Sequence, residues 1–308
     1  MEPFRVEQLR KERYDQIYFS PHMDDVAYSC AGRILQDRAQ NKSILVVTLF
    51  GNGSSLEQSE GASGTFDQYA DRLTEERAAM EALDADLIWL NLPELLFRKK
   101  SLTDLVRYCL PALPTPERAI QDQIKEQVLR VCRDRLAEGG EIFFPLGVGF
   151  HPDHCLTFEV GRALNASGEF RVQFYEDLPY AGVIDLAAMR RRLLGDARPR
   201  INLWRGATET TRKLMLIGRA RWLLWPLVLV QLCLLTALHR LRGSGPNALG
   251  MPTLEERGID DVVQRKAEVM RLYPSQTAFF FTLDEGLIEM LRREGRFVER
   301  TWTYPPTA

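Results

Sequence analysis

Short apolar runs alternate with helix-length segments through the first half of the chain, and this alternation constrains the fold most strongly. Runs rich in β-branched and aromatic residues predict strands at 15–20, 43–50, 86–92 and 141–146. Helical patterns lie between these runs, at about 26–39, 70–84 and 117–137. Strands separated by helices are typical of βαβ units. We therefore predict an α/β fold with a mostly parallel sheet flanked by helices.

Further elements are expected in the second half of the chain. A strand is predicted at 170–175, helices near 254–271 and 283–294, and a final strand at 296–304. Residues 51–68 are rich in Gly, Ser and acidic side chains, which predicts a long loop of the kind that often borders a site.

The charge balance excludes bulk electrostatic attraction to nucleic acid. The chain has 40 Lys and Arg against 42 Asp and Glu, a formal net charge of −2. Its five cysteines are scattered without a CxxC pair, which indicates reduced thiols in a cytoplasmic protein. The charged N-terminus has no apolar core of a secretory signal.

One apolar segment, 222–238, has 17 residues without a formal charge. As a helix it would be about 25 Å long, the short limit for crossing a bilayer. A buried or subunit-interface helix, an interfacial element and a membrane span are the alternatives. Arginines on both sides and nearby tryptophans favour interfacial contact. We expect an insertion at 195–250 that contacts the inner membrane face, and oligomerisation remains an alternative.

Histidine and aspartate side chains follow two of the predicted strands. The motif SPHMDD occupies 20–25, directly after the first strand, and the motif HPDH occupies 151–154, after the fourth. Three of the four histidines lie in these motifs. Because ligands bind at the carboxyl ends of strands in an open parallel sheet, the fold can bring both motifs together.

The two motifs together predict a zinc site. His22 and Asp25 are three residues apart at a strand-to-helix turn, so both side chains can face one point. Either His151 or His154 would complete the three protein ligands of a catalytic zinc. Asp24 would remain beside the metal as a base that takes a proton from water.

The other residues of HPDH suit supporting roles. The histidine that does not bind metal could polarise a carbonyl or hold an oxyanion, and Asp153 could hydrogen-bond one imidazole and fix its tautomer. Each motif alone is also typical of an ordinary capped helix N-terminus. The joint occurrence of both motifs at strand ends favours the metal site.

The sequence SPHMDDVAYSCAG resembles the SPHxDD…SCGG form of the first motif of the PIG-L/LmbE-like de-N-acetylases, and HPDH resembles their second metal motif. Weaker similarities occur at Arg72, at Leu92-Pro93-Glu94, at 174–179 and at 266–276. The resemblance covers about 14–180 and 262–280. It implies a Rossmann-like sheet and a zinc-dependent hydrolase that removes acetyl from an N-acetylglucosamine-type sugar.

The resemblance also implies a role for each motif residue. The zinc ligands would be His22, Asp25 and His154. Asp24 would be the general base and later a proton donor to the amine. His151 would stabilise the oxyanion, and Asp153 would orient it.

Two positions depart from the family pattern, with Met23 in place of Pro and Val26 in place of Glu. Neither would supply a metal ligand, although Val26 removes an acid near the metal. Arg72 and Glu176 are candidates for contacts with the substrate. Gln276 is expected to pack the C-terminal helix on the sheet.

We therefore predict that 1–308 form one domain, a zinc-dependent N-deacetylase acting on an amino sugar or sugar conjugate, including a lipid-linked one. An amidase acting on a non-sugar amide is one alternative. A carbohydrate- or lipid-binding protein that keeps the fold without turnover is another.

Overall fold

The computed structural model describes residues 5–6, 9–52, 69–95, 118–149, 151–182, 251–276, 292–293 and 295–306, with single residues at 187, 190, 191, 194 and 233.

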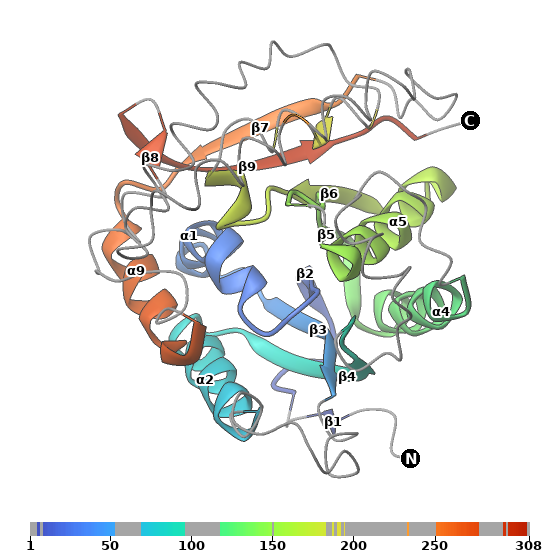
Figure 1. The fold of residues 1–308 in the computed structure, drawn as a ribbon, viewed down its shortest axis with the longest axis horizontal. Coiled ribbons are helices and arrows are strands. Elements are labelled where there is room, and N and C mark those ends of the chain that lie inside the picture. Colours follow the sequence, from blue (N-terminus) through green and yellow to red (C-terminus); the bar gives the residue numbers. More distant parts are fainter. Residues whose placement is uncertain are drawn as a thin grey trace.

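A parallel sheet forms the centre of the molecule (Figure 1). Its strands run in the order β4-β3-β2-β5-β6, and each pairs in parallel with its neighbours. Their bounds are β2 Tyr14–Ser20, β3 Ile44–Asn52, β4 Asp86–Pro93, β5 Leu136–Pro145 and β6 Arg171–Tyr175. The predicted α/β fold with a mostly parallel sheet is confirmed.

Antiparallel strands extend the sheet at both edges. Strand β1 (Arg5–Val6) pairs with β4 at one edge, and β9 (Arg296–Thr303) pairs with β6 at the other. Strand β7 (Thr253–Gly258) then pairs with β9, as does the short β8 (Arg292–Arg293).

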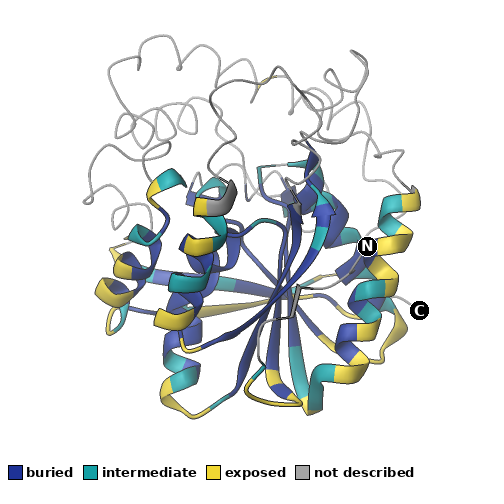
Figure 2. Cartoon of the chain, turned by 90° about the horizontal axis from the view of Figure 1, so that it is seen from below, coloured by how far each residue is buried: buried dark blue, intermediate teal, exposed yellow. Residues whose placement is uncertain are grey.

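Helices cover both faces of the sheet. Figure 1 shows α1 (Asp25–Ala39), α2 (Tyr69–Ala82) and α9 (Val263–Arg271) on one face. Helices α4 (Arg118–Arg135) and α5 (Pro152–Ser167) lie on the other. Figure 2 shows the central strands buried between helices whose outer sides are exposed.

The strand period of two explains these two layers, because successive side chains point to opposite faces. Ile17 and Phe19 of β2 join the hydrophobic cluster that includes Ile124 of α4. Tyr18, between them, joins the cluster that includes Ile34 of α1. Strands buried on both faces read as continuous apolar runs, which is the pattern that the sequence shows.

Two predicted elements differ from the structure. The helix expected over 254–271 begins only at Val263, because 253–258 pair with β9 along their whole length. Charged residues in TLEERG favour a helix locally, whereas pairing with a distant strand decides the conformation. The helix expected at 283–294 is replaced at its end by β8, and the rest of it lies outside the described residues.

The predicted insertion at 195–250 and its apolar segment 222–238 lie outside the described residues, apart from Cys233. Within the part of the chain that the structure describes, no helix combines the length and apolar character needed to cross a membrane.

Candidate active site

The turn from β2 into α1 presents His22, Asp24 and Asp25 at the carboxyl end of the central strand. Backbone-directed hydrogen bonds fix this turn: Asp25 Oδ2 accepts from His22 N at 2.8 Å, and Ser20 Oγ accepts from Val26 N at 3.2 Å. Asp24 occupies the N-cap position of α1, yet its side chain makes no capping hydrogen bond. Its carboxylate is therefore available to the adjacent pocket.

The HPDH motif opens helix α5 after strand β5. Pro152 stands in the first turn, and His151 is the N-cap, whose Nδ1 accepts from Asp153 N at 3.3 Å. The motif is thus a capped helix start, and this local geometry also presents His151 and His154 to the same pocket. An acceptor role for Nδ1 leaves the hydrogen of neutral His151 on Nε2.

Three ligand-type atoms from the two motifs form a nearly equilateral triangle. Asp25 Oδ2 lies 3.2 Å from His22 Nδ1 and 3.2 Å from His154 Nε2, and the two nitrogens are 3.3 Å apart. Tetrahedral zinc with bonds of about 2.0–2.1 Å places neighbouring ligand atoms about 3.3 Å apart. The donor set therefore fits zinc. Ligand atoms of His22, His151 and His154 also lie within 4.8 Å of one another.

A buried carboxylate holds His154 from behind. Asp177 Oδ1 lies 2.6 Å from His154 Nδ1, and Asp177 Oδ2 accepts from Val148 N at 2.9 Å. Burial disfavours the charged imidazole, but Asp25 and Asp177 outweigh this effect and raise the pKa of His154 to about 9. The far nitrogen is thereby held by a carboxylate, an arrangement typical of metal-binding histidines.

A second carboxylate supports His22. Asp153 Oδ2 lies 3.3 Å from His22 Nε2 and accepts from Leu95 N at 3.0 Å. The side chain of Asp153 thus contacts His22, whereas the backbone nitrogen of Asp153 donates to His151 Nδ1. This differs from the expectation that the Asp153 side chain orients His151.

The two remaining polar groups near the triangle differ in their protonation. Burial and the charge of Asp25 raise the pKa of Asp24 to about 6. Burial and the neighbouring His22 and His154 lower the pKa of His151 to about 3. At neutral pH Asp24 is therefore a carboxylate of moderate basicity, and His151 is a neutral imidazole that donates from Nε2.

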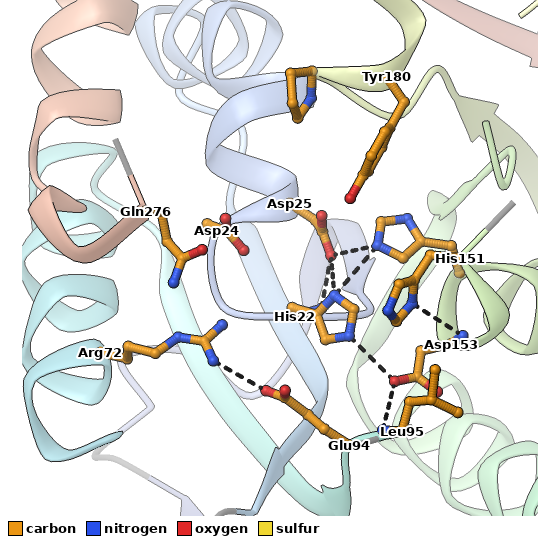
Figure 3. A pocket seen from close by; sticks show the side chains of 12 residues that line it. His22, Asp24, Asp25, Arg72, Glu94, Leu95, His151, Asp153, Tyr180 and Gln276 are labelled. Carbon is orange, nitrogen blue, oxygen red and sulfur yellow. Dashed lines mark hydrogen bonds and ion pairs between the residues drawn. The ribbon is translucent and has the colours of Figure 1, made fainter. Parts of the chain in front are cut away.

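Figure 3 shows the pocket that these side chains line. On the side away from Asp153, Arg72 of α2 donates from Nη1 to Glu94 Oε1 at 3.3 Å, and Gln276 lies near them. Tyr180, from the short helix η3 (Tyr180–Gly182), points its hydroxyl into the pocket toward Asp25. The lining residues are His22, Asp24, Asp25, Arg72, Glu94, Leu95, His151, Asp153, His154, Pro179, Tyr180 and Gln276.

Residues 17–165 match the family model described as PIG-L, GlcNAc-PI de-N-acetylase. This part of the chain is similar to the PIG-L family. This match includes both motifs of the pocket, and it confirms the resemblance drawn from SPHMDD and HPDH.

The chain is also similar to a protein of known activity in sequence and to solved structures in fold. A 2'-N-acetylparomamine deacetylase of Streptomyces fradiae is 28% identical over 195 residues, which cover 62% of this chain and 67% of the relative. The crystal structure of the A40926 pseudoaglycone deacetylase Dbv21 aligns with a TM-score of 0.57 at 17% identity, covering 96% of this chain and 99% of that one.

A structure described as the zinc inhibited form of teicoplanin deacetylase Orf2 aligns with a TM-score of 0.53 at 15% identity, over 93% and 96% of the two chains. At these identities the two structures show only that this chain shares their fold.

The fold brings nearly all of the predicted site residues to one pocket. These are His22, Asp24, Asp25, Arg72, His151, Asp153 and His154. Glu176 does not line the pocket; its Oε1 accepts from Trp302 Nε1 at 3.0 Å and ties the end of β6 to β9.

Other residues in or next to the pocket were not expected there. Gln276 lines it, although the sequence suggested a packing role. Asp177 contacts His154, and Glu94 pairs with Arg72. The strand-end position of Glu94 was a usable signal, whereas Tyr180 carries no local pattern that marks it.

Proposed function

We propose that this protein is a zinc-dependent N-deacetylase that hydrolyses the acetamide of an N-acetylated amino sugar or sugar conjugate. The triangle of His22, Asp25 and His154 carries the proposal, because it fits a tetrahedral metal. The same pocket contains the carboxylate of Asp24, which makes no capping hydrogen bond to α1. The relative named for deacetylation of 2'-N-acetylparomamine supports the reaction and the substrate class.

His22, Asp25 and His154 would hold the metal. Two imidazoles, each of which would lose its proton when metal binds, and one carboxylate form a mixed nitrogen and oxygen set that suits Zn²⁺. When bound, zinc would polarise the acetyl carbonyl and make water more acidic. Asp153 and Asp177 would keep the two imidazoles oriented through their far nitrogens.

Asp24 would move the proton that the reaction requires. It would accept a proton from the attacking water as the new C–O bond forms, and it would return that proton to the nitrogen as the C–N bond breaks. Acetate and the free amine are then the products. A pKa of about 6 suits both tasks, since the group must accept a proton and release it near neutral pH. His151 Nε2 would donate to the carbonyl oxygen as negative charge develops there.

The sugar would bind on the side of the pocket formed by Arg72, Glu94 and Gln276. Glu75 accepts from Ser275 N at 2.9 Å and from Ser275 Oγ at 2.6 Å, which ties α2 to the residues after α9. This link holds Arg72 and Gln276 at the same rim. Guanidinium, carboxylate and amide groups together donate and accept hydrogen bonds, as recognition of sugar hydroxyls requires.

The test combines metal analysis with an acetate-release assay. The purified protein is stripped with a chelator, reloaded with Zn²⁺, and assayed on N-acetylglucosamine conjugates, N-acetylparomamine and N-acetyl-lysine peptide. We expect acetate release from the sugars only, lost on chelation and restored by zinc. Preference for the peptide would indicate an amidase of another substrate class, and no acetate from any substrate in the zinc-loaded protein would refute the enzymatic proposal.

A further inference from the structure

Tyr180 lines the pocket but belongs neither to the proposed metal site nor to the proposed sugar side. Its phenol hydroxyl points into the pocket toward Asp25 (Figure 3). Its ring meets the ring of His154 edge-on, with centroids 6.1 Å apart and an interplanar angle of 88°. Among the residues that the structure describes, no group forms a hydrogen bond with this hydroxyl. Tyr180 thus presents an uncommitted donor beside the proposed zinc ligands.

The backbone around Tyr180 holds the ring in place. Ala181 N donates to Asp177 O at 2.7 Å, and Gly182 N donates to Pro179 O at 2.9 Å. Ala181 is fully buried, so the short helix is anchored on the core. The ring position therefore depends on the same segment that supports His154 through Asp177.

Gly149 makes room for the ring from the opposite loop. A Cβ atom at this position would lie 2.4 Å from Tyr180 Cγ and 2.7 Å from its Cδ1, and the backbone φ of Gly149 is +85°. Both the space and the conformation therefore require glycine. The loop after β5 and the segment after β6 fit each other so that the aromatic ring lies over the pocket.

We propose that the Tyr180 hydroxyl donates a hydrogen bond to the acyl oxygen of the substrate, from the side opposite His151, and stabilises the negative charge of the tetrahedral state. This inference rests on the proposed deacetylase function. Tyr180 keeps its proton throughout, and Asp24 carries out the proton transfers. Two donors, one imidazole and one phenol, would then form the oxyanion-binding site.

The hydroxyl of Tyr180, and not its ring, is the part that we expect to contact the substrate. A ring that only walled the pocket would work equally well as phenylalanine. The hydroxyl instead points into the pocket toward Asp25, one of the proposed zinc ligands. A polar group in this position suits a contact with a ligand, because an unpaired polar group in a closed complex costs free energy.

The test compares Tyr180→Phe, Tyr180→Leu and a matched control, Tyr175→Phe. The control change Tyr175→Phe also removes a buried hydroxyl, which donates to Phe19 O at 2.9 Å and does not line the pocket. We expect Tyr180→Phe to keep the wild-type melting temperature and zinc content, to keep KM within about threefold, and to lower kcat roughly 10²-fold. Tyr175→Phe should melt earlier and keep kcat. A wild-type kcat in Tyr180→Phe with a loss only in Tyr180→Leu would overturn the proposal in favour of a packing role.

A second readout is affinity for a methylphosphonamidate analogue of the N-acetyl sugar, whose P–O oxygens imitate the tetrahedral state. Calorimetry on zinc-loaded Tyr180→Phe should show affinity reduced by about the same factor as kcat/KM. Unchanged analogue affinity would also overturn the role. Failure of the deacetylase function itself is distinguishable, because the wild-type protein would then release no acetate.

Discussion

Replacing Asp177 by Asn tests whether the buried carboxylate behind His154 tunes a metal site. The substitution keeps the size of the side chain and removes its charge. In the structure Asp177 accepts two hydrogen bonds, from His154 Nδ1 at 2.6 Å and from Val148 N at 2.9 Å. An asparagine has one oxygen for these two donors, so its amide nitrogen must face one of them.

The size of the effect follows from these contacts. One buried donor loses its acceptor in either orientation of the amide, which costs about 1–3 kcal/mol of folding stability. Loss of the carboxylate partner of a metal-binding histidine typically lowers metal affinity about 10–100-fold. The variant should therefore melt earlier without metal and bind zinc more weakly.

The assay is a zinc titration in competition with a chromophoric chelator, paired with thermal melts of the metal-free proteins. Glu176→Gln is the matched control, because Glu176 is the neighbouring acid, does not line the pocket, and can keep its bond to Trp302 through the amide oxygen. Glu176→Gln should retain wild-type zinc affinity. If Asp177→Asn also binds zinc as tightly as the wild type, the contact between Asp177 and His154 does not strengthen zinc binding, and the predicted role of Asp177 is refuted.

Three further outcomes are expected. Asp24→Asn should keep its zinc and lose about 10²–10⁴-fold in acetate release, since the amide cannot accept a proton; near-normal turnover of the zinc-replete variant would exclude Asp24 as the base. His154→Ala should lose zinc in metal analysis whereas His151→Ala should retain it, and the reverse pattern would replace the assigned ligand. Burial raises the pKa of Glu76 from 4.5 to about 8, so the folded state holds a proton that the unfolded state has lost, and wild-type stability should fall as pH rises across this window. In urea unfolding, the free energy of unfolding of Glu76→Gln should rise relative to that of the wild type between pH 5 and pH 8. The same pH dependence in both proteins would contradict the raised pKa of Glu76.

Much of the central fold could be predicted from local patterns. Strands β2, β3 and β4 begin and end within two residues of the predicted ranges, because β-branched apolar runs between turn residues carry their own signal. Strand β5 begins at Leu136, five residues before the predicted start, and β7 was expected to be helical. Both differences arise where pairing with a neighbouring strand overrides a weak local preference.

The candidate site divides in the same way. His22, Asp24 and Asp25 share one turn, and His151, Asp153 and His154 share one helix start, so short-range spacing was enough to identify them. Other residues of the site reach it from segments that carry no such motif. Asp177 and Tyr180 depend on how the segment after β6 crosses the loop after β5, which contacts between distant residues decide.

The sequence by itself determined the alternation of strands and helices, the two motifs, and the chemistry that histidine and aspartate can supply together. Tertiary structure alone decided which atoms meet. Asp25 Oδ2, His22 Nδ1 and His154 Nε2 come within 3.3 Å of one another only because parallel strands β2 and β5 are neighbours and end at the same edge of the sheet. Spacing along the chain describes neighbours within a few residues, whereas a ligand triangle, its supporting carboxylates and an aromatic ring above it are set by packing across the whole fold.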